Sequence, residues 1–596
     1  MNEVLKRITL LREKMSEEKI DWYLITSDDF HSSEYVSNHF KVREYYTGFT
    51  GDNAFLLLNK ESAYMWTDGR FFIQAAIELM GTTIDLMKWG EEGVPTLSEF
   101  IKDNIQEGET LAFDGRTVSC KLGSKIKDIL DKKGAYIVFD KDFAGDLWTD
   151  RPAMPENKVF SLSDDEAGES VSSKLGRVRN ILKKKNASAL VLSKLDDIAW
   201  LVNLRGSDIE CNPVFLSYMI VGENDCYLFA KKNAIDDTVA GDLLKDGISL
   251  KEYDEFSDFL SLYEAGSMML EEESVSFATF VLAKNNKTIV RNANPTTLLK
   301  AVKNKREIER IKEITILDSV CVTKFMYWLK HLDDVSKVSE LDCAEKMDKL
   351  RSEVEGFIEL SFPTIAGYGP NAAMMHYEAT KDNFSYLKPE GLFLIDSGGQ
   401  YMKGTTDVTR TYSLGPVSDE IRLHFSKVVA GMLALADAKF IYGCTGRNLD
   451  IIARLPLWEL GIDYKCGTGH GVGYILNVHE GPHGIRWKYS KEVEEAVLED
   501  GMIMSDEPGV YVKDSHGIRI ENVILCTEDK KTDDGRFMKF EHLTWTPIDR
   551  DVIDKKYLSV RDIERIDDYH SKVFEITSKY FEGDELNWLK EVTKPL

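Results

Sequence analysis

The sequence predicts a protein of the α/β class with α+β character, in which two related N-terminal α/β domains precede a larger C-terminal domain. Two stretches of the first half, 21–37 (DWYLITSDDFHSSEYVS) and 188–202 (SALVLSKLDDIAWLV), each run from an apolar strand through a polar, acidic turn into a helix-like segment. This likeness predicts an internal duplication. The last third of the chain contains apolar runs joined by glycine-rich or turn-like segments, which are typical of β-hairpins.

Two interruptions of the hydrophobic pattern divide the chain. Pro152 and Pro155 stand beside an acidic, serine-rich run, which predicts the first boundary. Pro295 precedes a long pattern with apolar residues on one helical face and charges on the other, as expected for a helix packed on a sheet. Two further helical patterns close the chain, and we expect them to cover the last domain. The predicted domains are 1–152, 160–300 and 303–596.

Composition excludes several classes of function. The chain of 596 residues is 43% hydrophobic, enough to bury several cores, and its formal net charge of −26 disfavours binding to nucleic acid or to an anionic membrane surface. Its first residues have no apolar leader, and no stretch reaches the length of a membrane span. Eight cysteines are scattered without a C-x-x-C pair, as in a protein with reduced thiols. We therefore expect a cytoplasmic protein.

A first pair of candidate metal ligands, Asp396 and Asp407, lies in LFLIDSGGQYMKGTTDVTRTYSLG. An apolar run leads into Asp396, and a glycine-rich stretch then leads into the threonine-rich segment 405–411, which predicts a β-hairpin. A turn centred between Tyr401 and Met402 would set Asp396 opposite Asp407, with Cβ atoms about 5 Å apart. Two facing carboxylates repel each other unless a cation joins them.

A second hairpin with facing acids is predicted in MIMSDEPGVYVKDSHGIRIENVIL. A turn centred on Asp514 would set Glu507 opposite Glu521. Strand alternation then puts Arg519 on the same face as Glu521 and directs Ile518 and its alternate neighbours to the other face. An arginine at that place can hydrogen-bond a ligating carboxylate and hold its orientation.

The fifth candidate ligand, His470, stands in GTGHGVG, where glycines leave room for a close approach of backbone or substrate. An acid beside a turn is more often a solvated surface group, but two hairpins with mirrored acids and a framed histidine form an unusual set. Four carboxylates and one imidazole suit two divalent ions of the manganese type. Two such ions about 3.5 to 4 Å apart would share a hydroxide, which is a hydrolytic arrangement.

Two short motifs suggest other chemistry and are rejected. His479-Glu480-Gly481-Pro482-His483 satisfies H-E-x-x-H, but that zinc-protease motif requires a helix, and Gly481 and Pro482 oppose a helix there. GTGHGVG has neither the G-x-G-x-x-G spacing nor a preceding βαβ strand, so we read no nucleotide site into it.

The segments IDSGGQYMKGTTDVTRT, GTGHGVGYILNVHEGPHGI, SDEPGVYV and GIRIENV closely resemble the catalytic domain of aminopeptidase P, the Xaa-Pro aminopeptidase. The resemblance extends upstream through WTDGRFFIQAA, LDDIAWLVNLRGSDIECNPVFLSY and LSFPTIAGYGPNAAMMHY, and so covers nearly the whole chain. It implies a long, three-domain, cytosolic member, with a creatinase-like N-terminal domain and a C-terminal "pita-bread" metallopeptidase domain. The implied activity is release of the first residue from small peptides that have proline second, by a hydroxide activated by two metal ions, in a homodimer.

The resemblance also implies roles for single residues. Asp407 and Glu521 match carboxylates that bridge both ions, Glu507 matches a ligand that shuttles a proton, and Arg519 matches a residue that supports the site. His376 in MMHY and His479 in NVHEG match histidines that handle substrate. The implied metal ligands are Asp396, Asp407, His470, Glu507 and Glu521. One departure is Cys466, where many relatives carry a histidine; it affects the positioning of substrate but removes no ligand.

Three other functions remain open. A prolidase-like Xaa-Pro dipeptidase shares the metal set, although the extra N-terminal domain argues against it. A creatinase-like hydrolase works without metal, and such sites lack the carboxylates kept here. Pita-bread domains also serve as non-catalytic peptide- or histone-binding modules, but those have lost ligands. The sequence leaves the choice of metal and the preference at the first residue undecided.

Overall fold

The computed structural model describes residues 3–285, 287–489 and 495–596. The chain forms two compact units. The first contains residues 1–164 and 169–296, and the second contains residues 165–168 and 297–596. No helix of the described residues is long and apolar enough to cross a membrane.

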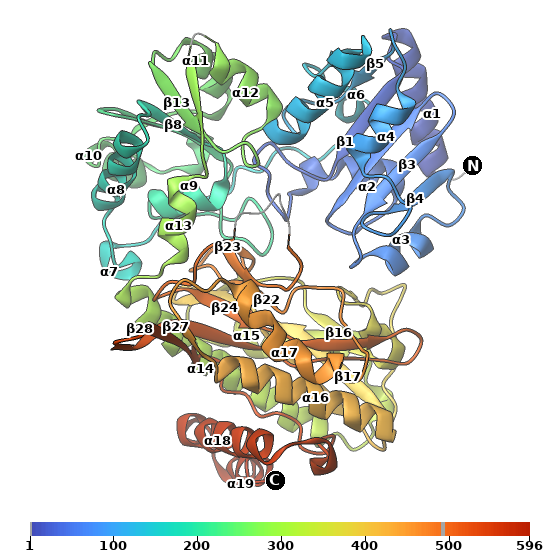
Figure 1. Cartoon of the computed structure of the whole chain (residues 1–596), viewed down its shortest axis with the longest axis vertical. Helices are drawn as coiled ribbons and strands as arrows, with labels where there is room; N and C mark the ends of the chain where they lie inside the picture. The colour runs from blue at the N-terminus through green and yellow to red at the C-terminus, as the bar shows by residue number, and fades with distance from the viewer. Residues whose placement is uncertain (1–2, 286, 490–494) are drawn as a thin grey trace. The chain divides into compact units, whose positions relative to one another are not determined.

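The first unit contains two six-stranded sheets that share one topology (Figure 1). In each sheet the first strand pairs antiparallel with the second and parallel with the fifth, so the sheet branches to both sides of its first strand. The first sheet has the order β4-β3-β2-β1-β5-β6 and consists of β1 (Trp22–Thr26), β2 (Ala54–Asn59), β3 (Ala63–Thr67), β4 (Ile84–Lys88), β5 (Thr110–Ala112) and β6 (Tyr136–Val138). The second has the order β12-β11-β10-β8-β13-β14 and consists of β8 (Ala189–Leu192), β10 (Ser217–Gly222), β11 (Cys226–Ala230), β12 (Ser249–Glu252), β13 (Ser267–Leu270) and β14 (Thr288–Arg291).

The helices repeat the duplication. In both copies a serine after the fifth strand caps the next helix: Ser119 accepts from Leu122 N–H at the start of α5 (Cys120–Lys133), and Ser276 does the same for α12 (Phe277–Lys284). The predicted duplication is therefore confirmed. The prediction of a helix within 21–37 is wrong, because β1 is followed there by turns and bends. In the second copy α9 (Leu195–Leu201) does follow β8 closely.

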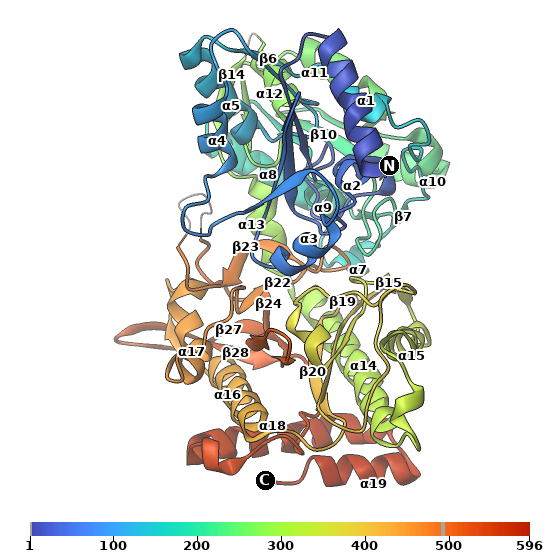
Figure 2. The same cartoon turned by 90° about the vertical axis from the view of Figure 1, so that its right-hand side faces the viewer.

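The second unit places strands between two pairs of helices (Figure 2). On one side lie α14 (Lys305–Lys330) and α15 (Glu340–Ser352), and on the other α16 (Asp419–Ala436) and α17 (Gly446–Trp458). Helices α18 (Val560–Thr577) and α19 (Gly583–Val592) form the predicted C-terminal pair, and α18 packs on α14 and α16. The first-half strands are β15 (Phe357–Leu360), β16 (Ile365–Tyr368), β17 (Leu392–Ser397), β18 (Gly399–Tyr401), β19 (Gly404–Thr405) and β20 (Val408–Ser413). The second-half strands are β21 (Lys439–Ile441), β22 (Gly469–Gly471), β23 (Glu480–Ile485), β24 (Ile503–Asp506), β25 (Gly509–Val512), β26 (His516–Arg519), β27 (Asn522–Thr532) and β28 (Gly535–His542).

Each helix pair buries one face of a hairpin, which decides where the acids point. Phe393 and Ile395 of β17 join the buried cluster beneath α14. Ile518 and Ile520 join the cluster beneath α16. Because successive side chains of a strand point to opposite faces, the residues between and after these apolar ones face away from both cores. The polar faces of the two hairpins are thereby left for the site.

Candidate metal centre

The first hairpin exists, but its register differs from the prediction. Strand β17 pairs antiparallel with β20 so that Asp396 faces Thr409, and Tyr401 pairs with Gly404 across a turn of Met402 and Lys403. The turn is centred one residue later than expected, which moves the pairing by two residues. Asp407 is therefore diagonal to Asp396 rather than opposite it.

The second hairpin has the predicted register. Gly509 pairs with Arg519 on one side of the two glutamates, and Asp506 pairs with Asn522 on the other. Glu507 and Glu521 thus occupy facing places between two pairs of the same register. The turn residue Asp514 has a φ of 60°, the left-handed conformation that aspartate tolerates better than most residues.

His470 joins the two hairpins. It lies on β22, which pairs with β24. Its Nδ1 is 2.9 Å from the carbonyl oxygen of Gly471, so Nδ1 carries the hydrogen and Nε2 has a free lone pair. That Nε2 is 3.4 Å from a carboxylate oxygen of Asp407 and 3.4 Å from one of Glu507. One ligand atom each of Asp407, His470 and Glu521 lie within 4.8 Å of one another.

Burial and mutual repulsion disfavour the ionised forms of the carboxylates in this cluster unless a cation lies among them. Burial, together with the neighbouring carboxylates Asp396 and Glu507, raises the pKa of Asp407 well above its usual value. Burial and Asp407 do the same to the pKa of Glu521. Oxygen Oδ1 of Asp396 is buried and has no hydrogen-bond partner among the described residues. Such a buried orphan oxygen is costly unless a ligand satisfies it.

Arg519 makes hydrogen bonds that connect the two hairpins. Its Nη2 donates to Oδ2 of Asp396, and its Nε donates to Thr409 Oγ1 at 3.2 Å. Thr409 Oγ1 in turn donates to Glu521 Oε2 at 2.8 Å, and Tyr511 OH accepts from Nη1 at 2.8 Å. One guanidinium therefore holds one oxygen of Asp396 directly and one oxygen of Glu521 through Thr409. The other oxygen of Asp396, Oδ1, has no hydrogen-bond partner among the described residues.

His479 lies beside His470, with ring centroids 4.3 Å apart and planes at 88°. The residue after it, Glu480, is fully buried and forms ion pairs with Lys300 at 3.3 Å and with Lys303. Residues 480–485 are the strand β23, so His479 and His483 do not share a helical face and the zinc-protease motif is excluded. The ion pairs of the two buried lysines with Glu480 hold the start of β23 in place.

His376 lies on a segment that reaches the same arginine. The carbonyl oxygen of Met375, the residue before it, accepts from Arg519 Nη2 at 3.4 Å. The structure therefore gathers Asp396, Asp407, His470, Glu507, Glu521, Arg519 and His479 directly and places His376 one residue from this network. Burial raises the pKa of Cys466 to about 12, which keeps the thiol protonated and unreactive.

The sequence patterns did not reveal several residues of this network. Thr409 and Ser505 are examples: Ser505 Oγ accepts from His470 N–H and donates to Glu507 Oε1 at 3.2 Å. Small hydroxyl residues carry no spacing signal of their own. The only available hint was their position two residues from a candidate ligand, on the same strand face.

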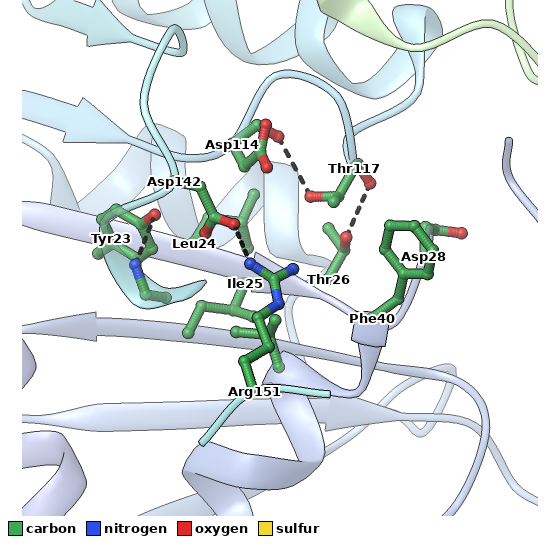
Figure 3. A pocket seen from close by; sticks show the side chains of 12 residues that line it. Tyr23, Leu24, Ile25, Thr26, Asp28, Phe40, Asp114, Thr117, Asp142 and Arg151 are labelled. Atoms are coloured by element: carbon green, nitrogen blue, oxygen red, sulfur yellow. Dashed lines mark hydrogen bonds and ion pairs between the residues drawn. The ribbon is translucent and has the colours of Figure 1, made fainter. Parts of the chain in front are cut away.

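A separate pocket in the first unit is lined by residues 23–26 of β1 and by residues that follow β5 and β6, among them Asp114 and Asp142 (Figure 3). Its acids include Asp114, which accepts from Arg116 at 2.8 Å, and Asp142, which accepts from Arg151 at 2.7 Å. Thr26 Oγ1 donates to the carbonyl oxygen of Thr117. These contacts tie strand ends together, and we assign the pocket a structural role.

Four family models match the chain. The Creatinase/Prolidase N-terminal domain matches twice, at residues 7–142 and 150–307. Metallopeptidase family M24 matches residues 309–528, and the C-terminal region of peptidase M24 matches residues 536–596.

Relatives match over the full length. The chain is 37% identical to a probable Xaa-Pro aminopeptidase P of Talaromyces marneffei and 36% identical to one of Laccaria bicolor, over 99% of this chain and 92% and 93% of theirs. A crystal structure of X-prolyl aminopeptidase from Caenorhabditis elegans, described as a cytosolic enzyme with a di-nuclear active site, has 31% identity and a TM-score of 0.94, with 100% of both chains covered. An Xaa-Pro dipeptidase from Bacillus anthracis, 20% identical with a TM-score of 0.51, covers 64% of this chain and 99% of its own, and shares the fold.

Proposed function

The chain belongs to the aminopeptidase P family of M24 metallopeptidases, and on this premise we propose that it is a metal-dependent aminopeptidase that removes the first residue from peptides with proline in second position. The observation that carries the proposal is the convergence of Asp407, His470 and Glu521 within 4.8 Å. A binding module that had lost its catalytic role would have no need of this set of ligand atoms.

The residues present fit two divalent metal ions. If all four carboxylates are ionised, Asp396, Asp407, Glu507 and Glu521 contribute four negative charges, against one positive charge on Arg519. Two atoms of this set are suited to bind a metal ion. Oδ1 of Asp396 is buried without a hydrogen-bond partner among the described residues, and Nε2 of His470 has a lone pair because the hydrogen is on Nδ1. We propose that Asp396, Asp407, His470, Glu507 and Glu521 would hold these two ions, since ligand atoms of Asp407, His470 and Glu521 already lie within 4.8 Å of one another. Hard oxygen donors with one imidazole suit manganese(II). When bound, two such ions lower the pKa of a water between them and polarise the scissile carbonyl.

The chain's own side chains handle the substrate and its protons. His479, whose ring lies against His470, donates a hydrogen bond to the substrate carbonyl oxygen as negative charge develops there. His376 contributes a second hydrogen bond from its own segment. Glu507 takes a proton from the attacking water and passes it to the departing nitrogen. Ser505, which donates to Glu507 Oε1, keeps that carboxylate directed at the site.

The proposed preference for proline rests on the full-length relatives, which are named probable Xaa-Pro aminopeptidase P. A bond before proline has a ring nitrogen without a hydrogen, so a site that required a backbone N–H at that place would reject it. Release of the first residue from longer peptides, rather than cleavage of dipeptides alone, is favoured by relatives that match over 99% of this chain and are named as aminopeptidases.

The test is release of the first residue from an Xaa-Pro-Yaa tripeptide, with Xaa-Ala-Yaa as control, by protein stripped with chelator and resupplied with manganese(II). Manganese-dependent cleavage of the proline peptide is expected. Cleavage of Xaa-Pro dipeptides only would identify a dipeptidase. Failure of the protein to bind metal would identify a non-catalytic binding module.

We further propose that the protein is a homodimer in the cytoplasm, with domains at 1–152, 160–300 and 303–596. Helix α17 exposes Ile451, Leu455 and Trp458 on one face, by 39%, 49% and 37% respectively. Three apolar side chains in one helical stripe form a surface suited to a second copy of the chain. Leu455→Glu should yield monomers in light scattering, whereas Leu244→Glu, at an exposed leucine of the other unit, should not.

A further inference from the structure

A buried glutamate, Glu340, has no part in the proposed chemistry. It is the first residue of α15, and none of its surface is exposed. A carboxylate is rarely buried unless it is paired or hydrogen-bonded. No Lys, Arg or His side chain of the described residues lies within ion-pair distance of Glu340, so hydrogen bonds alone satisfy it.

Every hydrogen bond of this carboxylate goes to one segment, residues 368–385, which carries His376. Oxygen Oε1 accepts from Tyr368 N–H at 2.6 Å and from the Asn371 amide at 2.9 Å. Oxygen Oε2 accepts from Tyr377 OH at 2.9 Å and from Ser385 N–H at 2.7 Å. The Asn371 amide is also 3.1 Å from Oε2.

These donors stand at both ends and in the middle of the segment. Tyr368 and Ser385 are its first and last residues, and Tyr377 directly follows His376. An ionised carboxylate accepts such bonds more strongly than a neutral group does, and its two oxygens have about four acceptor positions. Glu340 therefore closes the segment into a loop of fixed shape, with His376 next to one of the fixed points.

We infer that Glu340 is a positioning residue, which fixes the loop that presents His376 to the substrate. This inference rests on the proposed function for its catalytic consequence. The loop meets the metal centre where Met375 accepts from Arg519, so Glu340 and Arg519 hold the two residues on either side of His376, Met375 directly and Tyr377 through its hydroxyl. Catalysis requires the hydrogen-bonding group to be placed closely, and a displacement of about 1 Å can cost about 100-fold in rate.

Glu340→Gln is the informative change, because it keeps the size and replaces one acceptor oxygen by an NH2 donor. That donor must face either the Tyr368 or the Ser385 N–H, so one backbone amide loses its acceptor. Glu345→Gln, on the exposed side of the same helix, is the matched control. Tyr377→Phe removes only the bond next to His376 and serves if Glu340→Gln does not fold.

The measurements are kcat and KM for an Xaa-Pro-Yaa tripeptide, bound manganese, and amide hydrogen exchange. We expect Glu340→Gln to lower kcat by about 10- to 100-fold with manganese content unchanged, and Tyr377→Phe to lower it several-fold. In a His376→Ala background, either change should cost less than about twofold, because the residues act through His376. Exchange should speed up at the amides of 368–385 and not across α15.

Unchanged kcat in Glu340→Gln, or the same loss with and without His376, would overturn the inference while leaving the proposed function intact. Inactivity of the wild-type protein would refute the proposed function instead. Amide hydrogen exchange of Glu340→Gln would then decide the inference. Faster exchange confined to residues 368–385 supports a loop fixed by Glu340, and a uniform increase in exchange rates refutes it.

Discussion

Arg519→Lys tests whether one guanidinium orients the proposed metal ligands. Arginine holds Asp396 through Oδ2, Tyr511 through its hydroxyl, and Glu521 through Thr409. A lysine keeps the positive charge, but its single ammonium cannot reach these three directions at once. Without the hydrogen bond to Oδ2, the carboxylate of Asp396 is free to rotate, and its unpaired oxygen Oδ1 no longer has a fixed direction. Loss of such an outer contact typically costs about 10- to 100-fold in metal affinity, or about 1.4 to 2.8 kcal/mol.

The assay is calorimetric titration of manganese(II) into chelator-stripped protein, with Arg561→Lys on the surface of α18 as control. Arg519→Lys should bind manganese(II) more weakly than the wild type and should recover a large part of its activity at saturating metal. If the affinity of Arg519→Lys equals that of the wild type while turnover is lost, the arginine acts on the substrate and the argument from Asp396 is refuted.

The other predictions follow from single contacts. Asp407→Asn or Glu521→Gln should abolish turnover and reduce bound metal, measured by elemental analysis of desalted protein; full activity in both would refute the ligand assignment. Cys466→Ser should keep activity within about threefold, because the thiol is buried and protonated, and a larger loss would give Cys466 a role in the site. Burial lowers the pKa of His570 to about 3, and its Nε2 accepts from Ile548 N–H, so folding favours the neutral ring. As pH falls below about 6.5, unfolded protein binds a proton that the folded protein does not, which costs about 2 kcal/mol at pH 5. In urea titrations of metal-free protein, His570→Gln should therefore lose about that much less stability between pH 7 and pH 5, and an equal loss would contradict the assignment.

The two hairpins show what local sequence decides and what it does not. In the second, Asp514 is the natural turn residue between two apolar strands, and the predicted register is confirmed. In the first, several glycines near Tyr401 allow more than one turn, and the predicted register is wrong by two residues. A distant contact fixes it: Tyr401 OH donates to Asp318 of α14 at 2.7 Å. A turn with several permitted centres is placed by packing from elsewhere in the chain.

The contacts beside His479, which we propose to handle substrate, cannot be read from the sequence for the same reason. Lys303 and Glu480 are 177 residues apart, and nothing in either local pattern indicates that both are buried and paired. A charged residue in a helical pattern is ordinarily read as part of the solvated face. The fold class and duplication could be predicted because they depend on periodicity, which is local.

The error in register also explains why the candidate ligands could be found despite it. A shift of two residues keeps every side chain on its original face of a strand, whereas a shift of one would reverse all of them. Asp396 therefore still faces the interior of the site, while Thr409, instead of Asp407, occupies the place opposite it. The presence of Thr409 at that place has a chemical consequence. Its hydroxyl accepts from Arg519 and donates to Glu521, whereas an ionised carboxylate only accepts and could not donate to Glu521. Asp407, displaced along the hairpin, lies instead beside His470 and Glu521. The observed register thus supplies both a connection between the two hairpins and the separation that lets four carboxylates share one site.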